Sequence, residues 1–159
     1  MNHSVRPTDE QMKKIVDTYS NMLFKICFVM LCNEHDAEDA VQETFIKYLE
    51  RGPRFESDEH EKAWLIRVAE NISHNMIRFR VRHPAVNLDD LQEYCQDSSD
   101  LEALEFIMNI PAKYKSVLLL FYVERYQTDE IAKMLNLSET AVRKRLQYGR
   151  EILKHEYLN

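Results

Sequence analysis

Apolar residues return every three or four positions along most of this chain, which is the period of an amphipathic α-helix. This pattern predicts a first long helix from a capping box at Thr8 to about Leu31. It predicts a second helix over Asp36–Glu50, with Asp36 as its cap, and a third over Asp58–His83. The N-terminal half is therefore expected to be a bundle of helices.

The C-terminal part of the chain shows the same helical period. Helices are predicted over Leu101–Ile110 and Ala112–Glu124, and three residues are expected in their core: Leu118, Phe121 and Tyr122. Only two Gly and four Pro occur in 159 residues, which also favours helices over strands joined by tight turns.

A stretch of one charge sign separates the two helical parts. Residues 84–100 carry five acidic residues and no Lys or Arg, and they show little periodicity, which is typical of an extended linker. The predicted fold class is all-α, with two small helical domains over residues 8–83 and 101–157 joined by this acidic linker.

The last two predicted helices, Glu130–Leu135 and Ser138–Leu153, have the spacing of a helix-turn-helix. Asn136 lies in the corner, where a left-handed residue is needed, and Ser138 is a good N-cap residue. One side of the second helix is expected to be buried: Val142, Leu146, Gly149 and Leu153. Another side is expected to face outward: Thr140, Arg143, Lys144 and Gln147. Such a helix can enter a major groove and contact base edges, so DNA binding is predicted. The alternative is an ordinary packed helix pair with a solvated basic face.

The third predicted helix has an unusual polar side. Its buried side is expected to extend to Phe79. Its polar side combines amides, a His and guanidinium groups: Asn71, His74, Asn75, Arg78 and Arg82. A solubility face would normally carry Glu and Lys, so this row favours nucleic acid. Phe55 and Trp64 are candidates for stacking on single-stranded bases, although each residue taken alone is more typical of a core.

The second predicted helix carries an acidic face with an exposed apolar residue: Asp39, Gln42, Glu43 and Ile46. Such a face can be simply solvated, or it can bind a basic partner helix. Spacing leaves both alternatives open.

Charge limits how this protein can bind nucleic acid. The net charge is −6, and an acidic protein should bind phosphates weakly by itself. Residues 139–155 carry five Lys or Arg against two Glu, and residues 67–83 carry four Arg against one Glu. DNA contact is therefore expected to be local and assisted by a partner.

The sequence contains few other chemical signals. Cys27, Cys32 and Cys95 show no metal-ligand spacing and are interpreted as reduced thiols. The N-terminus lacks the apolar core of a signal peptide, and the apolar run Val117–Val123 is too short to span a bilayer. A cytoplasmic protein is therefore predicted. No nucleophile–base pair, phosphate loop or metal cluster stands out, so catalytic activity, a cofactor and a metal are not expected.

Three stretches together resemble the RNA polymerase sigma factors of the extracytoplasmic-function (ECF) group. They are DAEDAVQETFIKYL, AWLIRVAENISHNMIRFRVR and EIAKMLNLSETAVRKRLQYGREIL, and their order and spacing agree with that family. The resemblance covers nearly the whole chain and implies a specificity subunit that brings core RNA polymerase to a promoter and helps to melt it. Family members are commonly inhibited by an anti-sigma factor, so such a partner is expected as well.

The resemblance also implies roles for individual residues. Asp39, Gln42 and Glu43 would face the clamp helices of the polymerase β′ subunit. The loop of residues 55–60 with Asn71 and Asn75 would hold a base flipped from the minus-ten element, at a cost of a few kcal/mol offset by stacking. Three arginines would bind backbone phosphates: Arg78, Arg80 and Arg82. The minus-thirty-five element would be contacted by the outward side of the last helix together with Tyr148, which stands where many relatives have Arg.

Two other functions remain as alternatives at this point. A stand-alone helix-turn-helix regulator would bind duplex DNA tightly without polymerase. A helical adaptor would use its basic faces only for solvation and would not bind DNA.

Overall fold

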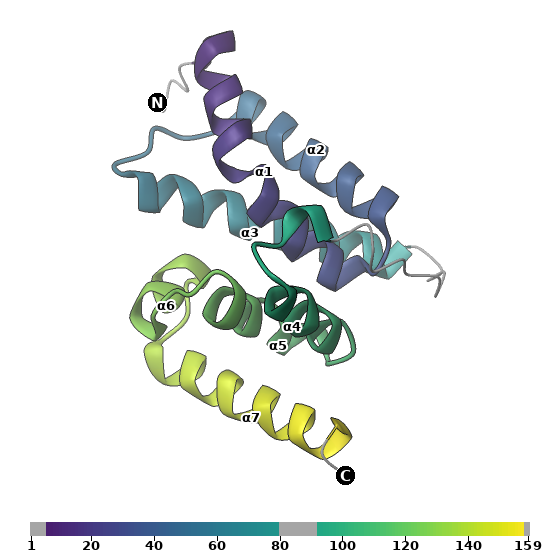
Figure 1. Ribbon diagram of the computed structural model, residues 1–159. Helices are drawn as coiled ribbons and strands as arrows, with labels where there is room; N and C mark the ends of the chain where they lie inside the picture. Colours follow the sequence, from purple (N-terminus) through teal and green to yellow (C-terminus); the bar gives the residue numbers. More distant parts are fainter. Residues whose placement is uncertain (1–5, 80–91, 158–159) are drawn as a thin grey trace. The chain divides into compact units, whose positions relative to one another are not determined.

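The structure is a computed structural model that describes residues 6–79 and 92–157 (Figure 1). The chain divides into two compact units, Met1–Pro84 and Ala85–Asn159. All regular secondary structure in the described ranges is helical, so the predicted all-α class with two helical domains is confirmed.

Three helices form the N-terminal unit: α1 (Asp9–Leu31), α2 (Glu34–Arg51) and α3 (Asp58–Phe79), each packed against the other two. The predicted capping box at the start of α1 is present, because the Thr8 hydroxyl accepts from the Gln11 N–H at 3.2 Å. Every residue from Met22 to Leu31 is buried, so the second half of α1 is the centre of this unit.

Two local predictions for this unit are wrong. Asn33, not Asp36, caps α2, because the Asn33 side chain accepts from the Asp36 N–H at 2.9 Å. Asn and Asp cap helices equally well, and the chain leaves α1 through Cys32 in a left-handed conformation, which places Asn33 at the cap position. Phe79 is 87% exposed instead of buried, since it lies in the last turn of α3.

The C-terminal unit begins with α4 (Ser98–Met108) and α5 (Ala112–Leu118). It continues with the π-helix η2 (Leu119–Val123), α6 (Thr128–Leu135) and α7 (Glu139–Tyr157), and α7 packs on α5 and α6. Helix α4 starts before Leu101, so Ser98–Asp100 at the end of the predicted linker are helical. Asp97 caps this helix by accepting from the Asp100 N–H at 3.0 Å.

The predicted helix over Ala112–Glu124 changes from α to π geometry at Leu119. The wider turn is closed by the Glu124 N–H, which donates to the Leu119 carbonyl at 3.1 Å. Tyr122, predicted to be core, is 43% exposed, and its hydroxyl accepts from Arg150 Nε of α7 at 2.6 Å. A wider turn rotates the following side chains about the helix axis, and Tyr122 therefore faces outward.

The predicted helix-turn-helix is formed by α6 and α7. Asn136 ends α6 in the left-handed conformation, with φ 54°, as its place in the corner predicted. The Ser138 hydroxyl accepts from the Ala141 N–H at 3.1 Å and so caps α7. Val142 and Leu146 are buried, which leaves the opposite side of α7 exposed.

Candidate nucleic-acid interface

Helix α7 presents a polar surface away from the core of its unit. Its four predicted members are all exposed: Thr140, Arg143, Lys144 and Gln147. Arg143 Nη2 donates to Glu139 Oε1 at 2.6 Å, and Gln147 Nε2 donates to Glu151 Oε1 at 3.4 Å. Guanidinium, ammonium and amide donors in one row can bind base edges or phosphates.

Tyr148 lies beside this row and leans toward α5. Its ring centroid is 6.5 Å from that of Tyr114, and Lys113 Nζ lies 5.3 Å from the centroid of the Tyr114 ring. Tyr148 is half exposed, so it remains accessible to a ligand while it contacts α5.

Helix α3 carries the second predicted surface. Four of its predicted members are exposed along one side of the helix: Asn71, His74, Asn75 and Arg78. Ala69, Ile72 and Ser73 on the other side are buried. Arg80 and Arg82, also predicted for this surface, lie outside the residues that the structure describes.

Phe55 and Trp64 belong to an aromatic cluster at the start of α3. The Phe55 ring stacks on Tyr48 of α2, with centroids 5.6 Å apart and an interplanar angle of 16°. It meets Trp64 and His60 edge to face, at 5.9 Å and 5.2 Å. Both Phe55 and Trp64 are partly exposed, so the cluster holds the loop between α2 and α3 against both helices without covering the two rings.

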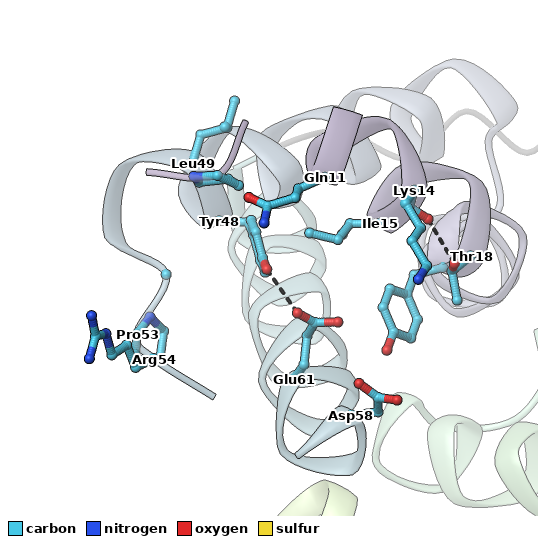
Figure 2. Close-up of a pocket in the computed structure, with 13 residues that line it drawn as sticks. Gln11, Lys14, Ile15, Thr18, Tyr48, Leu49, Pro53, Arg54, Asp58 and Glu61 are labelled. Atoms are coloured by element: carbon cyan, nitrogen blue, oxygen red, sulfur yellow. Dashed lines mark hydrogen bonds between the residues drawn. The ribbon is translucent and has the colours of Figure 1, made fainter. Parts of the chain in front are cut away.

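A hydrogen bond between α2 and α3 reinforces this cluster. The Tyr48 hydroxyl donates to Glu61 Oε2 at 2.8 Å (Figure 2). Burial, and then the bond to the Glu61 carboxylate, raise the pKa of Tyr48 above its ordinary value. Helical periodicity does not predict this pair, because the two residues are 13 positions apart and lie on different helices.

Figure 2 also shows a cavity next to the Tyr48–Glu61 pair, with a volume of about 460 Å³. The charged residues that line it have both signs: Lys14 and Arg54 are basic, and Asp58 and Glu61 are acidic. Of the residues predicted from the sequence to bind DNA or polymerase, only Asp58 of the loop of residues 55–60 lines this cavity.

The acidic face of α2 is solvent-accessible. Gln42 and Glu43 are exposed, and the apolar side chain of Ile46 is 49% exposed beside them. Asp39 is less exposed and lies 3.7 Å from His35 Nε2, while Glu43 Oε1 lies 3.8 Å from Lys47 Nζ. These weak, exposed pairs leave the carboxylates accessible to a basic partner.

The described residues contain no group of three or more His, Cys, Asp or Glu that could hold a metal ion. Cys27, Cys32 and Cys95 are not joined in disulfides, and burial raises the pKa of the Cys27 thiol to about 12. In the part of the chain that the structure describes, no helix is long and apolar enough to cross a membrane.

Comparison with known proteins agrees with this arrangement. The family model of Sigma-70 region 2 matches residues 15–83, and that of Sigma-70 region 4 matches residues 100–153. The ECF RNA polymerase sigma factor SigW of Bacillus subtilis (strain 168) is 31% identical in an alignment 163 positions long, which covers 89% of this chain and 86% of SigW. The chain belongs to the ECF RNA polymerase sigma factors.

Other comparisons agree with this family. The ECF RNA polymerase sigma factor SigX of the same organism is 26% identical, over 92% of this chain and 83% of SigX. The structure of CnrH, solved in complex with the cytosolic domain of CnrY, superposes with a TM-score of 0.70 at 22% identity, over 93% of this chain and 88% of CnrH. This last likeness concerns the fold.

An ECF sigma factor is a transcription initiation factor that binds core RNA polymerase and promoter DNA, and it is not an enzyme. The region 2 match also distinguishes this chain from a stand-alone helix-turn-helix regulator, because it covers the unit that lacks the helix-turn-helix.

Proposed function

We propose that three helices of this ECF sigma factor bind three different targets. Helix α2 binds core polymerase, α3 binds the minus-ten element, and α7 binds the minus-thirty-five element. The observation that carries the proposal is that three exposed surfaces of different chemistry lie on these helices, within the region 2 and region 4 matches.

The polymerase-binding residues in this proposal are Asp39, Gln42, Glu43 and Ile46. Accessible carboxylates beside an exposed Ile support it, because a basic helix with an apolar residue at its centre would complement both features.

The minus-ten residues in this proposal are Phe55, Trp64, Asn71, His74, Asn75, Arg78, Arg80 and Arg82. Amide groups suit the pairing edge of a flipped base, and guanidinium groups suit the phosphates on either side of it. The packing of Phe55 on Tyr48 supports the role of the loop. A loop that is already held in place loses less conformational entropy when a base binds to it.

The minus-thirty-five residues in this proposal are Thr140, Arg143, Lys144, Gln147 and Tyr148. Their exposure on the second helix of a helix-turn-helix supports this role, since that helix enters the major groove in this motif.

The remaining assignments concern the linker and the partners. The part of the predicted linker that precedes α4 would run toward the polymerase active-site channel, where its negative charge resembles that of a nucleic-acid strand; its residues 84–91 lie outside the residues that the structure describes. An anti-sigma factor is the proposed inhibitor, and the similarity to CnrH, which was solved with a bound protein, supports it. The proposed place of action is the cytoplasm, where core polymerase and promoter DNA are found.

Run-off transcription tests the proposal. Purified core polymerase is combined with a promoter library, with and without this protein, and the transcripts are sequenced. We expect transcripts from a subset of promoters only when the protein is present. Tight binding to duplex DNA in a gel shift without polymerase, combined with no effect on transcription, would contradict the proposal.

A further inference from the structure

Glu139 lies in the first turn of α7, and its carboxylate contacts two other side chains. One carboxylate oxygen, Oε1, accepts from Arg143 Nη2 at 2.6 Å and from the Thr128 hydroxyl at 3.1 Å. Thr128 begins α6, and Arg143 is one turn further along α7. A single carboxylate therefore links both helices of the helix-turn-helix to the Arg143 side chain.

This arrangement restricts the Arg143 guanidinium. An exposed arginine normally samples many rotamers, and ordering it on DNA costs conformational entropy. The short, charge-assisted bond to Glu139 fixes one end of the guanidinium before DNA arrives. Arginine has five N–H donors, and the donors not used by Glu139 remain available for the acceptors of a guanine or for a phosphate.

The simplest alternative is that Glu139 only stabilises α7. An acidic residue in the first turn interacts favourably with the helix dipole, and an exposed Glu–Arg pair at i, i+4 adds a small stabilisation to the helix. Neither effect needs the contact with Thr128 of α6, whose backbone position is set by the capping box of Gln127 and Glu130.

We propose that Glu139 is a positioning residue for promoter specificity, which holds Arg143 in register with one base pair of the minus-thirty-five element. This inference rests on the proposed binding of that element by α7. Glu139 does not contact DNA in this role. It narrows the set of base pairs that Arg143 can bind, and its negative charge weakens contacts of Arg143 with neighbouring phosphates.

The test is a double-mutant cycle on the complete holoenzyme. Core polymerase is reconstituted with the wild type, Arg143→Ala, Glu139→Ala and the double variant, and each transcribes a promoter library randomised over the minus-thirty-five element. The measured quantity at each position is the ratio of transcripts from the preferred base to those from the other three. Uniform changes in affinity, including those caused by charge, cancel in this ratio.

Each variant has an expected result. Arg143→Ala lowers discrimination by roughly fivefold or more at one or two positions, the range of a base-edge contact. Glu139→Ala lowers discrimination at the same positions, and the double variant is no worse than Arg143→Ala alone. The coupling between the two residues is about twofold or more, as for other side chains in contact. Glu139→Gln, which keeps the acceptor for Thr128 but loses the charge, falls between wild type and Glu139→Ala.

Glu151→Ala is the matched control, because it removes the same charge from α7 but its side chain binds Gln147. It should show no coupling with Arg143→Ala. Additive effects of Glu139 and Arg143, or a uniform loss at every position from Glu139→Ala, would overturn the inference while leaving the proposed function intact. If Arg143→Ala changes no position, the assignment of Arg143 to base recognition fails, and the role of Glu139 fails with it.

Discussion

Cys27 shows how burial sets the chemistry of a single residue. The thiol lies on α1 at the centre of the N-terminal unit and is fully buried. Desolvation disfavours the thiolate and raises the pKa from 9.0 to about 12. The thiolate is the reactive form, so this Cys is a small apolar core residue and not a redox site.

The shifted pKa of Cys27 predicts a pH dependence of stability. Because the folded-state pKa is higher than the unfolded one, the stabilisation is complete below pH 9 and is lost as pH rises from 9 toward 12. Over this pH range the free energy of unfolding should decrease with pH more steeply in the wild type than in Cys27→Ala. The difference between the two slopes should be up to about 1.4 kcal/mol per pH unit.

Urea unfolding between pH 8 and 11 measures this difference. The chain contains one Trp, Trp64 of α3, so its fluorescence reports the N-terminal unit. Cys95→Ala, a change in the other unit, should retain the wild-type dependence. Equal slopes for wild type and Cys27→Ala would mean that the thiol is not shielded from water.

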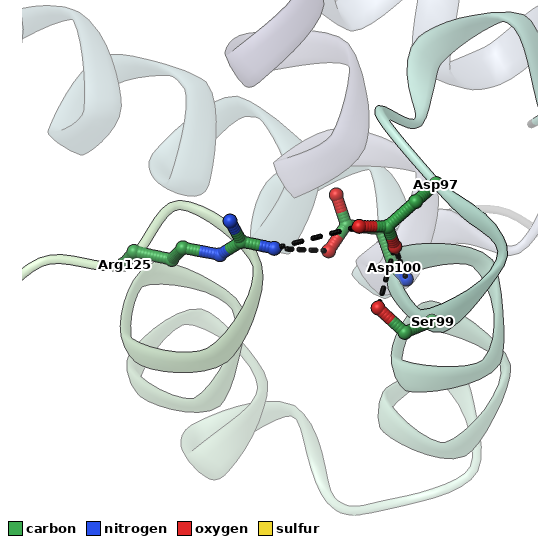
Figure 3. A network of polar contacts seen from close by, with 4 residues as sticks. All are labelled: Asp97, Ser99, Asp100 and Arg125. Carbon is green, nitrogen blue, oxygen red and sulfur yellow. Dashed lines mark hydrogen bonds and ion pairs between the residues drawn. The ribbon is translucent and has the colours of Figure 1, made fainter.

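Arg125 is a second residue whose role depends on its surroundings. It has φ 62°, which an L-residue rarely adopts, and its Nη2 lies 3.6 Å from Asp100 Oδ1 and 3.7 Å from Asp97 Oδ2 (Figure 3). The Asp100 side chain is only 4% exposed, so this carboxylate depends on a cationic partner. Asp97 is exposed, and bonds from the Ser99 hydroxyl and the Asp100 N–H, together with Arg125, lower its pKa.

Substitutions of Arg125 should separate charge from backbone strain. Arg125→Ala should destabilise the C-terminal unit by about 1–3 kcal/mol, because Asp100 loses its partner in a buried place. Arg125→Gly should cost about 1 kcal/mol less than Arg125→Ala, since Gly adopts positive φ without strain. Arg125→Lys should be the mildest.

Urea unfolding followed by far-ultraviolet circular dichroism measures this order of stabilities. The transition reported by Trp64 fluorescence should stay unchanged in all three variants, because Trp64 lies in the other unit. If Arg125→Gly is less stable than Arg125→Ala, backbone strain at position 125 is not significant.

At the scale of the element, α7 depends on a residue without a side chain. Gly149 lies against Leu118 of α5, and a Cβ built at Gly149 would be 2.7 Å from Leu118 Cδ1 and 3.2 Å from Cγ. Leu118 is fully buried and cannot move away freely. Gly is normally unfavourable inside a helix, so its presence here reflects the close approach of α7 to α5.

The close approach predicts that Gly149→Ala destabilises the C-terminal unit. The gain in helix propensity of about 1 kcal/mol should be outweighed by overpacking of about 1–3 kcal/mol. In a Leu118→Ala background the clash is removed, and Gly149→Ala should then stabilise. Thermal unfolding of the four proteins measures both effects. A stabilising Gly149→Ala in the wild-type background would refute the tight contact.

At the scale of the whole molecule, charge is unevenly distributed. The protein carries −6 overall, yet residues 139–155 have a net charge of +3. The total charge predicts weak binding of free DNA, and the basic segment predicts local contact with DNA. This distribution suits a subunit whose affinity for promoters comes from the complete holoenzyme.

Reversal of one charge on α2 tests the assembly of that holoenzyme. Glu43→Lys should weaken binding to core polymerase by about tenfold, because it places a cation where a basic partner helix is proposed. A pull-down with titrated core enzyme measures the affinity. Asp17→Lys, an exposed charge reversal on α1, should bind like the wild type. If the two variants bind equally well, Glu43 is outside the interface.

The sequence by itself determined the features that depend on near neighbours. Thr8 and Ser138 could be predicted as caps, and Asn136 as a left-handed corner, because each acts on residues within one or two helical turns. Helical periodicity likewise determined which sides of α3 and α7 are exposed, and with them most of the candidate binding residues.

Only the tertiary structure decided the features that join residues far apart in the chain. The Tyr48–Glu61 bond, the contact between Tyr122 and Arg150 across 28 positions, and the link from Thr128 through Glu139 to Arg143 follow from how helices pack. Periodicity shows which side of a helix is buried, but it does not specify which neighbour that side meets. The physical reason is that side-chain contacts between helices depend on their distance and rotation, which the packing of the whole unit fixes.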